Sequence, residues 1–338
     1  MRFTMRGIAV AALAAVGVAA LVVGGNVVLG QGRTVIGFQA SETSPLEPGW
    51  RWETHQIVQV QVPDSWKRSV GVGLKSSCGL DTVEPNPIVR RPGGAVVKSL
   101  HVCPTPKPKQ RHVSPSLEFA GDRPGIVRYA DGWTKETRRF GPQLITVTSA
   151  DDALRARIFA TAAVIIVADG NGCEPASPIA RNEILRPPAQ GGLTTVGAVE
   201  SVGVCRYEHP RGTPPRSDGA PYELALQASS RLTGDVARQL VRDLVAAPPG
   251  TGPTVTDQRV CADDPGGEII ILRVEGSEHD QDVIYRYAGC KHNGTDDGAT
   301  LRRATSATAK VVFAGVHQPD GYGNVLTQLL IGRPGPVL

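Results

Sequence analysis

The stretch Val58-Gln59-Val60-Gln61-Val62-Pro63-Asp64-Ser65-Trp66 decides the fold class of the first half of the chain. Valines alternate with glutamines, and a period of two residues is that of a β-strand with one buried and one solvated face. Pro63 has no N–H for a sheet ladder, so the strand is expected to end there and a turn to follow. We predict a half-buried strand over residues 58–62.

A helix and further strands are expected after this strand. Ser149 is the predicted N-cap of the helix, Asp151 and Asp152 suit the positive end of its dipole, and the helix is expected to end near Ala162. Its buried face is predicted to carry Leu154, Ile158 and Phe159, and the strands are expected at Val70–Leu74, Ala95–Val102, Gly125–Tyr129 and Gln143–Thr148.

All four tryptophans of the chain fall in this first half. We interpret them as residues of a small hydrophobic core, and the alternative is an aromatic platform on which a sugar stacks. They are Trp50, Trp52, Trp66 and Trp133.

The second half of the chain alternates between the two-residue period of strands and the 3.6-residue period of helices. Thr233 is the expected cap of an amphipathic helix that Pro248 stops, and a second helix is expected from Thr305. The segments that enter these helices resemble each other, which suggests a duplicated unit. Strands are expected at Val199–Tyr207, Leu224–Ala228 and Leu301–Arg303, and a hairpin at Glu268–Glu275 and Asp282–Ala288.

Composition and length indicate a globular protein of two domains. Of the 338 residues, 41% are hydrophobic, which is enough to form hydrophobic cores, and 20% are charged, which is typical of a globular protein. The net charge of +4 is too small and too dispersed to indicate a nucleic-acid partner. We predict an α+β fold with a transmembrane helix over 1–30, a stalk over 31–49, domains over 50–168 and 193–338, and a linker over 169–192.

The N-terminal segment has the features of an export signal. Residues 7–32 contain no charged side chain, and Arg2 and Arg6 precede them, which favours a cytoplasmic N-terminus. Ile8–Leu29 reaches the length of about 20 residues that a membrane span needs. We predict a single-pass signal-anchor that holds the C-terminal domains outside the cytoplasm. The alternative is a secreted protein, because Val18-Ala19-Ala20 offers a cleavage site.

The six cysteines predict three disulfides in an oxidising compartment. Cys261 and Cys290 flank the predicted hairpin, whose two ends meet, so these two sulfurs are expected within bonding distance. Grouping by domain then pairs Cys78 with Cys103 and Cys173 with Cys205.

The chain lacks the common catalytic motifs. It has no G-x-S-x-G, H-E-x-x-H, phosphate-binding loop or dinucleotide-binding glycine pattern. We therefore predict no catalytic, cofactor-binding or metal-binding residues and no cofactor. The pairs His101/Cys103 and Cys290/His292 resemble zinc ligands, but the predicted disulfides consume their thiols. Three oxygen-rich stretches could hold calcium and are interpreted as Asx-type turns: Asp263–Asp264, Asn293–Gly298 and Asp320–Asn324.

Two resemblances accompany these patterns. Val58–Trp66 and Leu154–Ala162 together resemble the Mog1/PsbP-like α+β fold of secreted bacterial lipoproteins, which implies a binding or assembly module and carries over no catalytic residue. The chain as a whole resembles a group of exported actinobacterial proteins without an assigned activity. That second resemblance rests on Val58–Trp66, Asn171–Cys173, Val204–Tyr207, Arg231–Gly234 and Tyr287–Gly294.

These observations predict binding rather than catalysis. The expected protein is a membrane-anchored component of the cell envelope that binds a wall polymer, a protein partner or a small molecule. The alternative is an enzyme of unfamiliar type with a cleft between its two domains. If the protein is an enzyme, we expect a cleft with clustered titratable groups of perturbed pKa. If it is a binding module, we expect an exposed aromatic or apolar groove.

Overall fold

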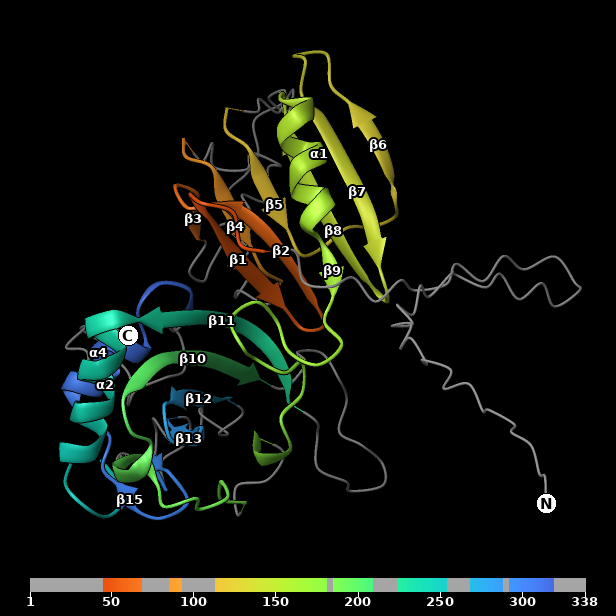
Figure 1. Cartoon of the computed structure of the whole chain (residues 1–338). Coiled ribbons are helices and arrows are strands. Elements are labelled where there is room, and N and C mark those ends of the chain that lie inside the picture. Colours follow the sequence, from red (N-terminus) through yellow and green to blue (C-terminus); the bar gives the residue numbers. More distant parts are fainter. Residues whose placement is uncertain are drawn as a thin grey trace, which may run out of the picture. The chain divides into compact units, whose positions relative to one another are not determined.

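The valine–glutamine stretch forms the second strand of a β-hairpin. β1 (Trp50–His55) pairs antiparallel with β2 (Val58–Pro63), with Arg51 opposite Val62 and His55 opposite Val58. The strand predicted over 58–62 is therefore confirmed. Figure 1 shows this computed structural model, which describes residues 45–68, 85–92, 113–180, 185–208, 224–253, 268–287 and 292–318.

Two sheets and one helix enclose the first hydrophobic core. β1, β2 and β9 form one sheet, and the other has the order β3-β4-β5-β8-β7-β6. β3, β4 and β5 run parallel to one another, and the remaining neighbours are antiparallel. The strands are β3 (Lys67–Arg68), β4 (Ile88–Arg90), β5 (Ser116–Glu118), β6 (Gly125–Arg128), β7 (Thr134–Phe140), β8 (Gln143–Ser149) and β9 (Ala163–Val164).

Helix α1 (Asp152–Thr161) packs against β2 and β8 and buries Ile158 and Phe159, as predicted. Its N-cap is Asp151 and not Ser149, so that prediction is wrong. The Asp151 carboxylate accepts a hydrogen bond from the Leu154 N–H at 2.9 Å, whereas Ser149 is still the last residue of β8. The backbone remains extended as far as Asp151, and a helix can be capped only where that extended conformation ends.

Both faces of β2 are buried, which corrects the prediction of a half-solvated strand. The valine side chains enter the first core, and Gln59 and Gln61 are only 2% and 0% exposed. The Gln59 Oε1 accepts from the Gly170 N–H at 2.7 Å. The Gln61 amide accepts from the Glu47 N–H and donates to the Pro45 carbonyl. The glutamine face is thus covered by other backbone segments whose polar groups it satisfies.

The C-terminal part is built on one antiparallel sheet of order β11-β10-β12-β13-β14-β15. Its strands confirm the hairpin and the other strands predicted in the second half of the chain. They are β10 (Val199–Glu208), β11 (Ala225–Thr233), β12 (Glu268–Gly276), β13 (Gln281–Arg286), β14 (Gly294–Asp296) and β15 (Leu301–Arg302).

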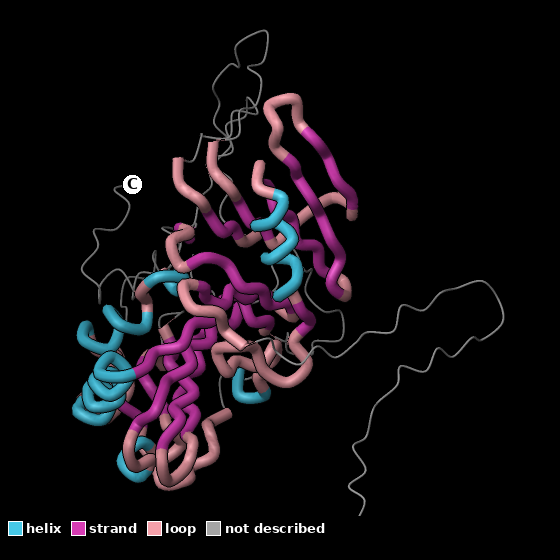
Figure 2. The backbone as a smooth tube through the Cα atoms, turned by 45° about the horizontal axis from the view of Figure 1, so that its top comes forward, coloured by secondary structure: helices cyan, strands magenta, loops and turns pink. Residues whose placement is uncertain are grey.

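Helices α2 (Gly234–Ala246) and α4 (Ser306–Val312) contact each other and cover one face of this sheet (Figure 2). Thr233 and Thr305 are their N-caps, as predicted. Val204 and Leu272 point into the core under these helices, and the alternate residues of the same strands point to the opposite face. Three short 3-10 turns complete the described elements: η1 (Pro178–Ala180), η2 (Leu193–Thr195) and η3 (Gly315–His317).

The opposite face of this sheet is covered by the chain that follows β9. Ile165, Cys173 and Ala180 pack there against Cys205 and Ile271. A disulfide joins Cys173 to Cys205 with a Cα–Cα distance of 5.6 Å, which confirms this predicted pairing. The cysteines of the other two predicted pairs, Cys78, Cys103, Cys261 and Cys290, lie outside the described residues.

Sheets with few helices confirm the α+β class. Residues from Ser41 onward group into one compact unit, and the division into domains at 169–192 stays a prediction. Among the described residues, no helix is both long and apolar enough to cross a membrane. The predicted transmembrane helix, most of the stalk, and the strands predicted at Val70–Leu74 and Ala95–Val102 fall outside these residues.

Candidate functional site

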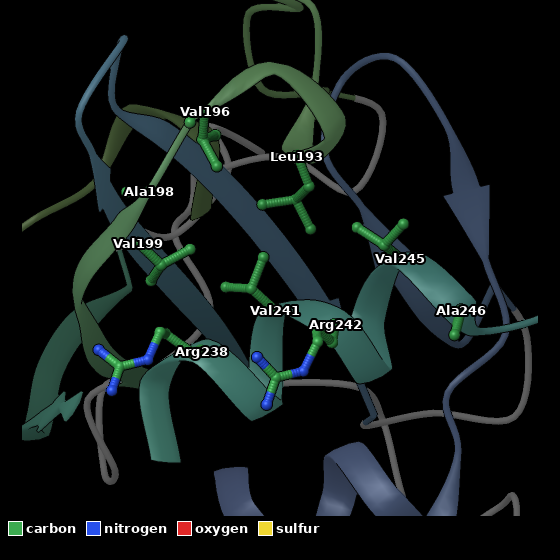
Figure 3. A pocket seen from close by; sticks show the side chains of 10 residues that line it. Leu193, Val196, Ala198, Val199, Arg238, Val241, Arg242, Val245 and Ala246 are labelled. Atoms are coloured by element: carbon green, nitrogen blue, oxygen red, sulfur yellow. The ribbon is translucent and has the colours of Figure 1, made fainter. Parts of the chain in front are cut away.

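An apolar pocket of about 430 Å³ lies between α2 and the chain that leads into β10 (Figure 3). The aliphatic side chains of Leu193, Val199, Val241 and Val245 point into this space. We call it the α2 pocket. Its lining residues are Leu193, Val196, Gly197, Ala198, Val199, Arg238, Val241, Arg242, Val245 and Ala246.

The sequence of α2 produces this lining. Val241 and Val245 are four residues apart and therefore lie on one face of the helix, and Arg238 and Arg242 have the same spacing. Opposite them, Gly197 has a φ of +77° and lies against the side chains of Ser277 and Glu278. A side chain at this position would collide with both residues, so glycine keeps the loop closed over the β12–β13 turn.

Two guanidinium groups stand at the edge of the pocket. Arg238 donates to Asp235 at 2.7 Å, and this hydrogen bond lowers the pKa of the Asp235 carboxyl. Arg242 donates to the side-chain oxygen of Gln239 at 2.7 Å, and no described carboxylate forms an ion pair with it. The pocket therefore combines apolar walls with an edge that carries two guanidinium groups, of which that of Arg242 has no carboxylate in an ion pair among the described residues.

The lining of the α2 pocket contains no side chain that commonly acts as a nucleophile or a general base. None of the ten residues around the α2 pocket is a His, Cys, Ser, Thr, Tyr, Asp or Glu, so its walls provide no nucleophile and no general base.

A second feature, a cluster of buried charged side chains, lies at β1, which runs beside β11. Glu53 is fully buried and accepts from Arg51 at 2.6 Å, Arg68 at 2.7 Å and Arg91 at 2.5 Å. We call Glu53 and these three arginines the arginine cluster. Burial alone raises the pKa of Glu53, but the positive charges of Arg91, Arg68 and Arg51 outweigh it and lower that pKa to about 2.

Two buried histidines lie near the arginine cluster. Burial, followed by the charge of Arg91, lowers the pKa of His55 to about 3. Burial and the charges of Arg206, Arg91 and Arg68 hold the pKa of His317 well below its usual value. The His317 Nε2 lies 2.9 Å from the Ser230 hydroxyl. Both imidazoles are therefore neutral at physiological pH.

The oxygen-rich turn at 293–298 has partners other than a metal ion. Asp296 accepts two hydrogen bonds from Arg186 at 2.8 Å, and Asp297 accepts from Arg302 at 3.0 Å. Within the described part of the chain, no three His, Cys, Asp or Glu side chains gather as metal ligands would. The stretches Asp263–Asp264 and Asp320–Asn324 lie outside it.

Sequence reasoning found neither the α2 pocket nor the arginine cluster. The spacing of Arg238 and Arg242 beside Val241 and Val245 was the available signal for the pocket edge, because residues four apart lie on one face of a helix. Arg68 and Arg91 carry no such signal, because only tertiary packing brings them to Glu53, whereas Arg51 precedes Glu53 by two residues on β1.

The chain was also compared with known proteins. No family model, no curated protein and no solved structure matches it. The resemblances to the Mog1/PsbP-like fold and to exported actinobacterial proteins stay predictions.

Proposed function

We propose that this is an extracytoplasmic binding protein whose α2 pocket holds an anionic amphiphile: one aliphatic chain with a carboxylate or phosphate head. The observation that carries the proposal is the combination of an aliphatic pocket of about 430 Å³ with two arginines at its edge.

The walls account for the apolar part of such a ligand. Small-molecule sites typically have volumes of about 300–1,000 Å³ and mainly apolar linings, and the α2 pocket fits both criteria. Apart from Gly197 and the two arginines its lining is aliphatic, and it contains no aromatic ring. It therefore suits a flexible hydrocarbon chain better than a sugar ring, which usually stacks on an aromatic side chain.

The arginines account for the charged part. A guanidinium group presents donors in a planar fork that matches a carboxylate or a phosphate. Arg242 has no carboxylate partner among the described residues, and Arg238 is held only by the exposed Asp235. An anionic head at this edge would gain two charged contacts without breaking a buried ion pair.

The predicted signal-anchor supports the same proposal. An anchored protein outside the cytoplasm is exposed to membrane lipids and their breakdown products, whose chains and anionic heads have this chemistry. A single-chain lipid of the envelope is therefore the proposed physiological ligand.

Binding is favoured over the enzymatic alternative. The walls of the α2 pocket lack acid–base groups. The contact between Ser230 and His317 lacks a third group among the described residues that would orient the imidazole. The His317 Nδ1, where that group would bind, has no hydrogen-bond partner among the described residues.

The test compares two ligands with the same chain and opposite charge, dodecanoate and dodecyltrimethylammonium. Each is measured by equilibrium dialysis against the full-length protein below its micelle concentration. Dodecanoate is expected to bind at least about ten-fold more tightly, because each charge-assisted hydrogen bond contributes about 1.5–3 kcal/mol. The double substitution Arg238→Gln and Arg242→Gln should remove this preference, and Ala246→Trp should block both ligands.

Arg128→Gln provides the matched control, because it removes one exposed positive charge on β6, outside the α2 pocket. It should leave the affinity for dodecanoate unchanged. The proposal fails if the cationic ligand binds as well as the anionic one, or if Ala246→Trp leaves both affinities unchanged.

A further inference from the structure

The arginine cluster has more positive than negative charge. Arg51, Arg68 and Arg91 surround one buried carboxylate, Glu53, and their side chains are themselves mostly buried. Glu53 compensates one of the three charges. Buried charges are costly unless they are paired, so a cluster with an excess of two positive charges suits a further anion.

Arg68 of this cluster and the nearby His317 each have nitrogen atoms that are not used within the described part of the protein. Arg68 pairs with Glu53 through its Nε, and its terminal nitrogens form no hydrogen bond with any residue that the structure describes. His317 is only 1% exposed, and its Nδ1 has no hydrogen-bond partner among those residues. A buried imidazole nitrogen without a partner is rare and calls for a ligand or a water molecule.

Gly315 lies close to both groups, two residues before His317 in the chain and beside the Arg68 side chain. It starts the η3 turn that ends in His317 and has a φ of +58°. A Cβ at this position would lie 3.1 Å from the Arg68 Nη1. Glycine therefore leaves the guanidinium group room beside the turn that carries the imidazole.

The contact between Ser230 and His317 is compatible with the histidine tautomer that an anion needs. Its hydroxyl can donate to the His317 Nε2 across their 2.9 Å contact, and the ring proton then resides on Nδ1. The unpartnered nitrogen becomes an N–H donor on a ring that the charges of Arg206, Arg91 and Arg68 influence. This arrangement offers an N–H and a guanidinium fork to the same kind of ligand, an oxygen anion.

We propose that Arg68, His317 and Ser230 form a binding site for a tetrahedral oxyanion of the phosphate class, either as the free ion or as the phosphate group of a larger molecule. Arg68 and the His317 Nδ1–H donate to the anion, and Ser230 positions the imidazole. The excess charge of the arginine cluster favours a multiply charged oxyanion over a single carboxylate. The site shares no residue with the α2 pocket and does not depend on the proposed lipid ligand.

The experiment titrates the full-length protein with inorganic phosphate and, separately, with glycerol 3-phosphate, at constant ionic strength set by chloride. The readout is the ¹⁵N chemical shift of the His317 ring, because phosphate stabilises many proteins without binding a site. A saturable shift with a Kd of about 1 mM or tighter is expected. A response to phosphate alone identifies the free ion as ligand, and a response to both identifies the phosphate group of a larger molecule.

Arg68→Gln should weaken phosphate binding by at least about ten-fold, since it removes charge-assisted hydrogen bonds. Ser230→Ala keeps every charge and should weaken phosphate binding by about three-fold or more, because the His317 ring loses its hydrogen-bond partner at Nε2. It is the test variant if Arg68→Gln does not fold. Arg90→Gln is the matched control: Arg90 also pairs with one carboxylate, that of Glu118, and does not act on His317.

The site is refuted if phosphate gives no saturable shift, or if Arg68→Gln and Ser230→Ala bind phosphate as tightly as Arg90→Gln. The Arg238→Gln and Arg242→Gln changes in the α2 pocket should leave phosphate binding intact. The two proposals can therefore fail separately.

Discussion

Glu53 shows how one buried carboxylate can determine its surroundings. It accepts hydrogen bonds from three arginines that the sequence places at positions 51, 68 and 91. Arg51 also donates to the backbone carbonyls of Pro63, Asp64 and Trp66, so the same network holds the turn after β2. Removal of the carboxylate would leave several buried positive charges without compensation.

We predict that Glu53→Gln lowers the free energy of unfolding by about 3–5 kcal/mol, the usual cost of breaking a buried ion pair from one side. Urea denaturation at neutral pH measures it. Glu118→Gln is the control, because Glu118 pairs with Arg90 in a half-exposed position and should cost less than about 1 kcal/mol. Equal losses in the two variants would contradict the role assigned to Glu53.

The buried histidines make stability depend on pH. His55 has a pKa of about 3 in the folded protein, and that of His317 is also well below its usual value. In the unfolded chain both titrate near about pH 6.5. Below that pH the unfolded state binds more protons than the folded state, so acidification destabilises the protein.

Between about pH 7.5 and about pH 5.5, each of these histidines should cost about 1.4 kcal/mol of stability, and the pair about 3 kcal/mol. Urea denaturation across this range tests the prediction. The double substitution His55→Asn and His317→Asn should flatten the pH profile even if it lowers stability at every pH. An unchanged slope in that variant would show that other groups cause the pH dependence.

Helices α2 and α4 begin alike in sequence and differ in their caps. The Thr305 hydroxyl accepts from the Thr308 N–H, and the Thr308 side chain reciprocates, which makes a capping box. Thr233 occupies the same position before α2, but its side chain forms no capping hydrogen bond. The similarity of the two helix entries therefore does not extend to their hydrogen bonds.

This difference gives a matched pair of variants. Thr305→Ala should lower the free energy of unfolding by about 1 kcal/mol, the typical value of an N-cap side chain. Thr233→Ala should have a clearly smaller effect, because no cap hydrogen bond is lost. Thermal or urea denaturation of the two variants decides the point, and equal effects would show that threonine acts at both sites through backbone propensity alone.

At the level of elements, sequence periodicity predicted the helices and about half of the described strands, and it did not predict β1, β4, β5 or β7. The alternation of Val58, Val60 and Val62 is local and strong, so the strand could be predicted, and the 3.6-residue repeat of α2 could be predicted for the same reason. The burial of Gln59 and Gln61 could not, because distant backbone segments cover them. The cap of α1 was misplaced because Ser149 and Asp151 have similar capping propensity.

The candidate sites were less predictable than the elements. The α2 pocket needs the loop at 193–199 to lie across α2. The arginine cluster needs β1 to meet Arg68 of β3 and Arg91, which follows β4. Only packing brings these residues together. The disulfide between Cys173 and Cys205 could be predicted because cysteine pairing has few alternatives once the chain is divided into regions.

At the scale of the whole molecule, Asp169 connects the two halves of the chain. Its carboxylate accepts from Thr54 of β1 at 2.7 Å and from Ser229 of β11. It also accepts from the backbone N–H groups of Asn171 and Cys173, which form the turn that carries the disulfide. The segment predicted as a linker thus begins with a buried turn, and the loss of this carboxylate should loosen the coupling between the two halves.

Asp169→Asn tests this coupling. All four tryptophans lie in the N-terminal half. The helical circular dichroism of the described residues comes mostly from the C-terminal half, because α2 and α4 have 13 and 7 residues and α1 has 10. In the wild-type protein, tryptophan fluorescence and circular dichroism should report one coincident urea transition. In Asp169→Asn the two midpoints should separate, because an amide cannot accept all four hydrogen bonds and each unsatisfied buried donor costs about 1–3 kcal/mol.

The exposed Asp122 supplies the control, and Asp122→Asn should keep the transitions coincident. Separate transitions already in the wild-type protein would mean that the two halves unfold independently, as the division into two domains predicts, and that Asp169 does not couple them. Coincident transitions in Asp169→Asn would instead assign the coupling to the backbone hydrogen bond from Gln56 to Leu226 and to the packing of β1 along β11.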